Sequence, residues 1–129
     1  MSSHKELVRE GFYRLRIEDG ILFADFWPQL VITIEIAQSI VKDRIRLQAA
    51  LEYPVCTDVR QLKSLDKASR DFFSSEDGGL RKVSAGALIV NSYLSKIISN
   101  FYLRLASPQK PARVFTDPRE AKNWLKNYR

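Results

Sequence analysis

Cysteine and histidine are nearly absent from this sequence, with one of each among 129 residues. The single cysteine, Cys56, excludes an internal disulfide and agrees with a reducing compartment, so we expect a cytoplasmic protein. The only histidine is His4, so no imidazole base is expected beside a serine or cysteine nucleophile in the folded part of the chain. One cysteine and one remote histidine also fall short of the ligand set of a zinc site. We interpret Cys56 as a small apolar residue of a buried strand.

Glycine and long apolar runs are also scarce. The five glycines are scattered or stand in expected turns, which excludes a P-loop and a dinucleotide-binding fingerprint. The longest apolar stretches, residues 30–36 and 85–90, are far shorter than the roughly 20 residues of a membrane-spanning helix. The start of the chain lacks the pattern of a secretion signal. We therefore expect no catalytic residues, no cofactor, no metal and no transmembrane segment; an enzyme using only Asp, Arg and Tyr is the remaining catalytic alternative.

Basic residues outnumber acidic ones by 21 to 15, a net charge of +6. From residue 104 onward, seven basic residues stand against two acidic ones, so most of the excess lies near the C-terminus. Aromatic residues do not alternate with these basic residues on one face, as they would in a groove that binds single-stranded nucleic acid. We predict that nucleic acid is not the partner.

The length of the chain suits one domain, which we predict at residues 12–129 after a flexible leader at residues 1–11. Residues 12–18 alternate between apolar and polar, and Asp19-Gly20 is a typical two-residue hairpin turn into a strand at 21–26. Further strands are predicted at 55–59, 83–90 and 113–116. The domain should therefore open with a β-hairpin.

Four helices are predicted between and after these strands. The first runs from an N-cap at Thr33 to about residue 51, and the second from Ser64 or Asp66 to about residue 75. The third begins at Asn91 or Ser92. The fourth has an N-cap at Asp117, followed by Pro118 at the first helical position and Glu120 in a capping box. The order predicts an α/β fold with a mixed, mostly parallel sheet of about five strands, an N-terminal hairpin and four helices.

This order and particular residues resemble the STAS/SpoIIAA-like superfamily, and within it the bacterial proteins described as STAS/SEC14 domain-containing. The segments that carry the resemblance are residues 54–60 (PVCTDVR), 68–73 (ASRDFF), 85–98 (AGALIVNSYLSKII), 100–104 (NFYLR) and 113–117 (RVFTD), with Glu120, Ala121, Trp124 and Leu125. The resemblance implies a SpoIIAA-like fold and a regulatory or protein-interaction role. The similarity to SEC14-like domains implies lipid or apolar-ligand binding.

In the STAS proteins that act as anti-sigma-factor antagonists, a serine at the start of the helix after the third strand is phosphorylated. The resemblance therefore points to Ser64 as a phosphoacceptor. The family's Asp-Ser-Ser/Thr-Gly motif is absent, however, and residues 62–67 (LKSLDK) stand in its place.

Arg44 and Gln48 project near the middle of the apolar side of the first predicted helix. A buried arginine is costly unless it reaches water, a carboxylate or a ligand. The first alternative is that Arg44 extends past the sheet edge to water or forms a structural ion pair. The second is a site for an anionic headgroup or an acidic partner surface. Arg14 and Arg16 define a second surface: if all helices cover one side of the sheet, their face is open to another copy or another protein.

We predict a non-enzymatic regulatory or protein-interaction domain that forms a homodimer or higher homo-oligomer. The loop at residues 58–64 and the start of the third helix should form the partner surface, with Asp58, Arg60, Ser64, Asn91 and Ser92 as its residues. The alternative is a small-ligand or lipid-like binding domain with a pocket near Arg44 and Gln48. Neither the partner nor the ligand is named by the sequence.

Overall fold

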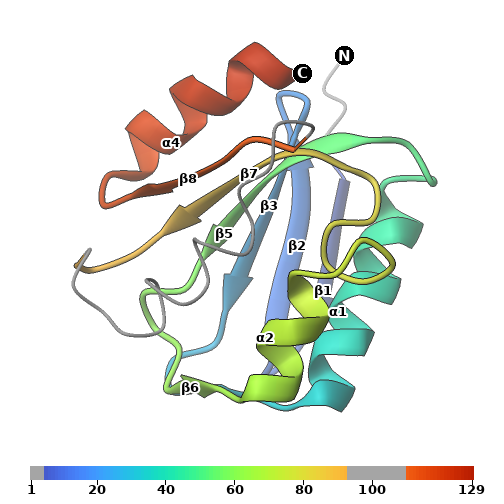
Figure 1. The fold of residues 1–129 in the computed structure, drawn as a ribbon, viewed down its shortest axis with the longest axis vertical. Helices are drawn as coiled ribbons and strands as arrows, with labels where there is room; N and C mark the ends of the chain where they lie inside the picture. The colour runs from blue at the N-terminus through green and yellow to red at the C-terminus, as the bar shows by residue number, and fades with distance from the viewer. Residues whose placement is uncertain (1–4, 93–109) are drawn as a thin grey trace.

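A six-stranded mixed sheet forms the centre of the molecule in the computed structural model, which describes residues 5–92 and 110–129 (Figure 1). Its strand order is β1-β2-β3-β5-β7-β8, antiparallel from β1 to β3 and parallel from β3 to β8. The bounds are β1 Lys5–Arg9, β2 Tyr13–Glu18, β3 Ile21–Phe26, β5 Tyr53–Asp58, β7 Val83–Ile89 and β8 Ala112–Phe115. A separate short pair joins β4 (Val31–Ile32) to β6 (Ser64–Leu65) in parallel.

The predicted hairpin joins β2 to β3. Asp19 and Gly20 have φ angles of 56° and 75°, the positive values that a tight two-residue hairpin turn requires. The alternation in β2 buries Tyr13, Leu15 and Ile17 on one face, as the sequence pattern indicated. Local signals in the sequence are therefore enough to predict this hairpin.

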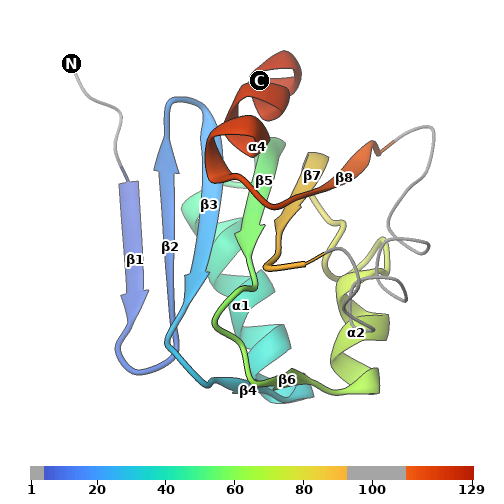
Figure 2. The same cartoon turned by 90° about the vertical axis from the view of Figure 1, so that its left-hand side faces the viewer.

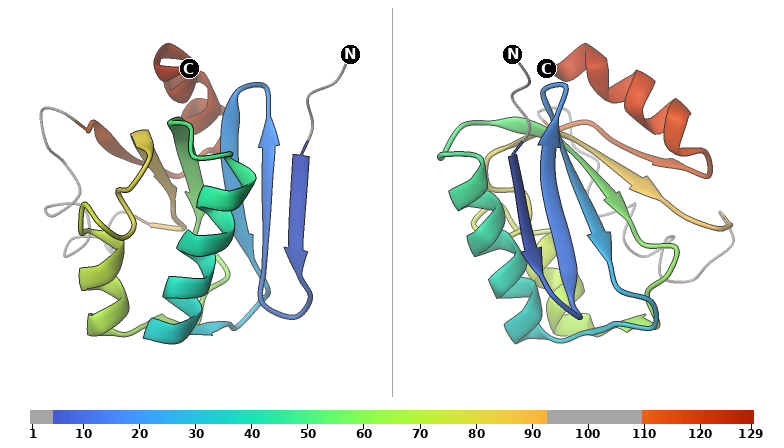
Figure 3. Two further views of the ribbon diagram at one scale, coloured as in Figure 1. Left: turned by 90° about the vertical axis from the view of Figure 1, so that its right-hand side faces the viewer. Right: turned by 180° about the vertical axis from the view of Figure 1, so that it is seen from behind.

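Helices cover both faces of the sheet. The helices α1 (Ile34–Leu47) and α2 (Lys67–Phe73) lie on one face, whereas α4 (Pro118–Leu125) and a 3₁₀ turn at Lys126–Tyr128 lie on the other (Figures 2 and 3). The α4 helix packs on β5, β7 and β8, so it leaves that face of β1 to β3 without a covering helix among the described residues. The core is therefore divided into layers on the two sides of the sheet.

Two of the predicted N-caps make the expected hydrogen bonds. The Asp66 carboxylate accepts from the Ser69 backbone N–H at 2.8 Å, and the Asp117 carboxylate accepts from the Arg119 N–H at 2.9 Å. Thr33 also occupies an N-cap position, but its side chain makes no capping bond. Asp66, rather than Ser64, is therefore the cap of α2, and Ser64 lies in β6.

Two predictions about the elements need correction. The leader was predicted to be flexible, yet residues 5–9 form the edge strand β1, held by pairing with β2 and by the burial of one side of Leu7. The sheet has six strands rather than about five, because β1 was missed. The described part of the chain contains three of the four predicted α-helices; the helix expected from Asn91 or Ser92 lies outside that part and stays a prediction.

The first helix is also shorter than predicted. It ends at Leu47 because Ala49 and Ala50 adopt positive φ angles of 53° and 59°, which a helix cannot continue.

Candidate functional site

The predicted partner residues lie together at the carboxyl ends of the parallel strands. Asp58 ends β5 and begins the loop to Ser64, while Asn91 and Ser92 follow β7, the neighbouring strand. The Asn91 Nδ2 donates a hydrogen bond of 3.0 Å to the Arg60 carbonyl oxygen and so joins the two segments. We call this surface, residues 58–64 with Asn91 and Ser92, the carboxyl-end edge. Open α/β sheets bind their ligands at such an edge.

Asp58 and Arg60 form a local pair within this edge. Arg60 donates from Nε and Nη2 to the two carboxylate oxygens of Asp58, at 3.0 and 2.8 Å, and its backbone N–H donates to the same carboxylate at 3.1 Å. These bonds raise the pKa of Arg60 above its ordinary value. The Arg60 side chain is still 37% exposed, so Asp58 holds the loop while Arg60 faces solvent.

A pocket of about 290 Å³ lies between the sheet and the helices α1 and α2. Its walls are mainly apolar side chains from β3, β5, β7, β8 and the two helices, including Phe26, Ile40, Val55, Phe73, Leu88 and Val114. Arg60, Ser64, Asn91 and Ser92 line it as well. The carboxyl-end edge is therefore one end of this pocket.

Arg44 lines the same pocket from α1 and is only 4% exposed. Its Nη1 donates to Gln48 Oε1 at 2.7 Å, and its Nη2 donates to the carbonyl oxygens of Arg81 and Gly79 at 2.8 and 3.2 Å. Burial, with a smaller contribution from the charge of Arg81, lowers the pKa of Arg44 to about 10. Among the residues that the structure describes, Arg44 therefore meets neutral acceptors and no carboxylate.

Gln48 has a structural position. Its Nε2 donates to the carbonyl oxygens of Leu51 and Lys82, at 2.7 and 2.9 Å, while its Oε1 accepts from Arg44. All the polar groups of this side chain are therefore used in holding the chain after α1 and the turn before β7. Gln48 holds the Arg44 guanidinium in place by this hydrogen bond, and Arg44 is the one of the two that lines the pocket.

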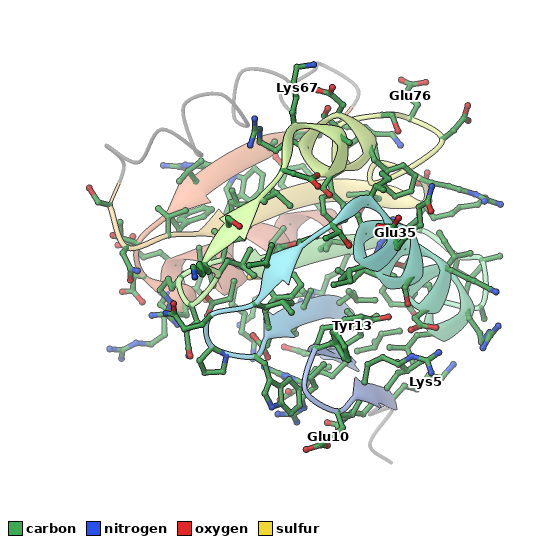
Figure 4. All side chains as sticks on the ribbon, turned by 90° about the horizontal axis from the view of Figure 1, so that it is seen from below. Lys5, Glu10, Tyr13, Glu35, Lys67 and Glu76 are labelled. Carbon is green, nitrogen blue, oxygen red and sulfur yellow. The ribbon has the colours of Figure 1, made fainter. Side chains whose placement is uncertain are left out.

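A buried network was missed by the sequence analysis. The Asp43 carboxylate, 3% exposed, accepts two hydrogen bonds from Arg9, at 2.8 and 2.9 Å, and one of 2.6 Å from the Tyr13 hydroxyl. The Tyr13 hydroxyl also lies 2.6 Å from Ser39 Oγ, so Tyr13 reaches from β2 to α1 (Figure 4). The hydrogen bonds from Arg9 lower the pKa of Asp43, and burial raises that of Tyr13.

No local signal marked this network, because Arg9 belongs to the strand that was taken for a flexible leader.

Cys56 lies on the other side of the sheet and is 2% exposed. Burial, with the nearby carboxylates of Asp58 and Asp25, raises the pKa of its thiol to about 12. A thiol with that pKa stays protonated near neutral pH and is a poor nucleophile.

Among residues 5–92 and 110–129, no group of three or more His, Cys, Asp or Glu side chains is arranged to hold a metal ion.

Within residues 5–92 and 110–129, no helix covers the face of β1 to β3 that carries Arg14 and Arg16, whereas α4 covers β5, β7 and β8 on that side. Arg14 pairs with Glu6, with its Nε 2.9 Å from Oε2, and Arg16 pairs with Glu18. The Arg16 guanidinium also lies over the Phe23 ring, 4.4 Å from its centroid. These basic groups are paired within their own sheet, as on an ordinary solvated face.

Comparison with a solved structure supports the fold. The crystal structure of an uncharacterised protein of the DUF3478 family from Shewanella loihica PV-4, described as having a SpoIIAA-like fold, is similar with a TM-score of 0.58. The similarity covers 97% of this chain and 98% of that one, at 18% sequence identity. This confirms the SpoIIAA-like α/β fold, while the narrower STAS/SEC14 branch stays a prediction.

No curated protein matches the chain. In the described part of the structure, no helix is long and apolar enough to cross a membrane. A family model does match, over residues 15–129, and its description is "Domain of unknown function (DUF7793)". The chain belongs to that family.

Proposed function

We propose that this chain is a non-enzymatic regulatory domain that binds a protein partner through its carboxyl-end edge. The observation that carries the proposal is the hydrogen bond from Asn91 to the Arg60 carbonyl, which makes one surface from two segments about 30 residues apart in sequence. The SpoIIAA-like fold supports the regulatory part of the proposal. The protonated, buried thiol of Cys56 argues against cysteine catalysis.

The exposed groups of this edge suit a polar protein surface. Arg60 presents a half-exposed guanidinium, Lys63 is exposed, and Ser64 and Asn91 add a hydroxyl and an amide. Arginine is enriched at the centres of protein interfaces because it pairs its charge, hydrogen bonds and apolar stem with one partner surface. The predicted homodimer or higher homo-oligomer is part of this proposal, with a second copy as one candidate partner.

Capture from extract of the source cell tests the partner surface with three baits: the natural chain, Arg60→Glu and Lys126→Glu. Lys126 is an exposed basic residue at the C-terminal end of α4, away from the carboxyl ends of the strands, and serves as the matched charge-reversal control. We expect the same protein with the natural chain and with Lys126→Glu, and its loss with Arg60→Glu. Circular dichroism checks that both variants are folded.

Two results would contradict the proposal. One is a strictly monomeric molar mass in solution together with no protein recovered repeatedly. The other is equal recovery by Arg60→Glu, which would place the interface elsewhere.

A second candidate function is small-ligand binding, favoured by the apolar pocket and by Arg44 in its wall. Pockets that bind small molecules are mostly apolar with a few fixed polar groups, and this one has that composition. Native mass spectrometry of the freshly purified chain tests this function. Retained extra mass on the folded chain supports it, and the bare polypeptide mass in repeated preparations argues against it.

A further inference from the structure

We propose that the pocket binds a small amphipathic acid, with its carboxylate toward Arg44 and its apolar chain along β7; this rests on the second candidate function above. The pocket is lined both by Val83 at the start of β7 and by Asn91 just after its end. It therefore follows the strand, which suits a linear ligand better than a compact one. Since one water molecule occupies about 30 Å³ in the liquid, a volume near 290 Å³ corresponds to roughly ten water molecules, which limits the ligand to a small molecule.

The buried positive charge of Arg44 in the wall of the pocket favours an anionic ligand. Arg44 is 4% exposed, and its hydrogen-bond acceptors are one side-chain amide and two backbone carbonyls. Its Nε donates no hydrogen bond to the described residues, and none of the lining residues that the structure describes is acidic. A buried charge that is paired only with neutral groups costs free energy, and an anionic ligand lowers that cost.

Gly86 lines the pocket on β7. A Cβ atom built at Gly86 meets no atom of residues 5–92 or 110–129 within 4 Å, so these residues leave room beside the strand there. Its φ is not in the positive range, so a larger residue there causes no backbone strain. Gly86→Leu should therefore fill the pocket while the chain stays folded.

Isothermal titration of the full chain with octanoate and with octanamide tests the proposal at pH 7. The two probes have the same number of non-hydrogen atoms and differ in charge. We expect one octanoate per chain, bound at least about tenfold more tightly than octanamide, because a hydrogen bond to a charged group is worth more than a neutral one.

The expected pattern among variants is as follows. Arg44→Met removes the preference for octanoate, Gly86→Leu abolishes binding of both probes, and the surface control Arg119→Met changes neither. If Arg44→Met fails to fold because Arg44 also holds Gly79 and Arg81, the preference of the natural chain and the Gly86→Leu result still decide.

Equal affinity for the two probes, or an unchanged preference in folded Arg44→Met, would overturn the assignment of an acid while leaving the pocket as a ligand site. Binding of neither probe, or binding that survives Gly86→Leu, would overturn the assignment of this pocket to a small acid. The partner surface is tested separately by Arg60→Glu, so the failure of one proposal is distinguishable from failure of the other.

Discussion

At the scale of single residues, Asp43 is the polar group whose surroundings matter most for stability. Its carboxylate is almost fully buried and accepts from Arg9 and Tyr13 together. Removing the charge leaves a guanidinium without its partner and weakens the bond to Tyr13. Because Arg9 is half-exposed and can turn to water, the cost should be smaller than for a fully buried pair.

We therefore expect Asp43→Asn to lower the free energy of unfolding by about 1–3 kcal/mol, measured by urea denaturation. Arg14→Met, which removes an exposed pair with Glu6, is the control and should cost less than about 1 kcal/mol.

The pKa of Asp43 is lower in the folded chain than in the unfolded one, so the contribution of the Asp43 carboxylate to stability is present above its unfolded pKa. The difference between natural chain and Asp43→Asn should stay constant from pH 7 to pH ~5 and shrink as the pH falls below ~4. A difference that grows on acidification would contradict this account.

At the scale of elements, the clearest comparison is between the N-caps of α4 and α1. Asp117 accepts a hydrogen bond from the Arg119 N–H, whereas Thr33 makes no capping bond. Asp117→Ala should therefore cost about 1 kcal/mol in the free energy of unfolding, and Thr33→Ala less than half as much. Thermal unfolding followed by circular dichroism compares the two, and an equal cost would mean that the cap of α4 adds little.

Elements that depend on interactions between residues close in the sequence were predictable, and elements that depend on residues far apart in the sequence were not. The Asp19-Gly20 turn, the Asp66 cap and the Asp117 cap each depend on residues within four positions, and all three are present. The strand β1 was missed because most of its side chains are exposed. Its ion pair with α1, from Arg9 to Asp43, joins residues 34 positions apart in the sequence.

The site shows the same division. The meeting of the loop after β5 with Asn91 follows from the general behaviour of parallel strands, so the sequence order was enough to predict it. Arg44 was expected to reach water or a carboxylate, whereas the structure buries it, with acceptors on Gln48 and on two backbone carbonyls 35 and 37 positions away. Backbone carbonyls have no sequence signature, so neither its partners nor the shape of the pocket was predictable.

At the scale of the whole molecule, the two proposed binding regions are continuous. Arg60, Ser64, Asn91 and Ser92 belong both to the carboxyl-end edge and to the lining of the pocket. The opposite side of the sheet has different properties: α4 covers β5, β7 and β8, and Arg14 and Arg16 pair with glutamates of β1 and β2. Binding is therefore expected on the side of α1 and α2, at the carboxyl ends of the strands.

Photo-crosslinking in the source cell tests this claim most directly. A photo-reactive phenylalanine derivative replaces Lys63, which is exposed within the carboxyl-end edge, or Lys126, which is exposed at the C-terminal end of α4. That end of α4 lies at the amino end of β7, where Ser84 Oγ donates to the Tyr128 carbonyl oxygen. We predict a discrete, light-dependent product of higher mass from the Lys63 position and none from the Lys126 position. A product from the Lys126 position alone would contradict the account.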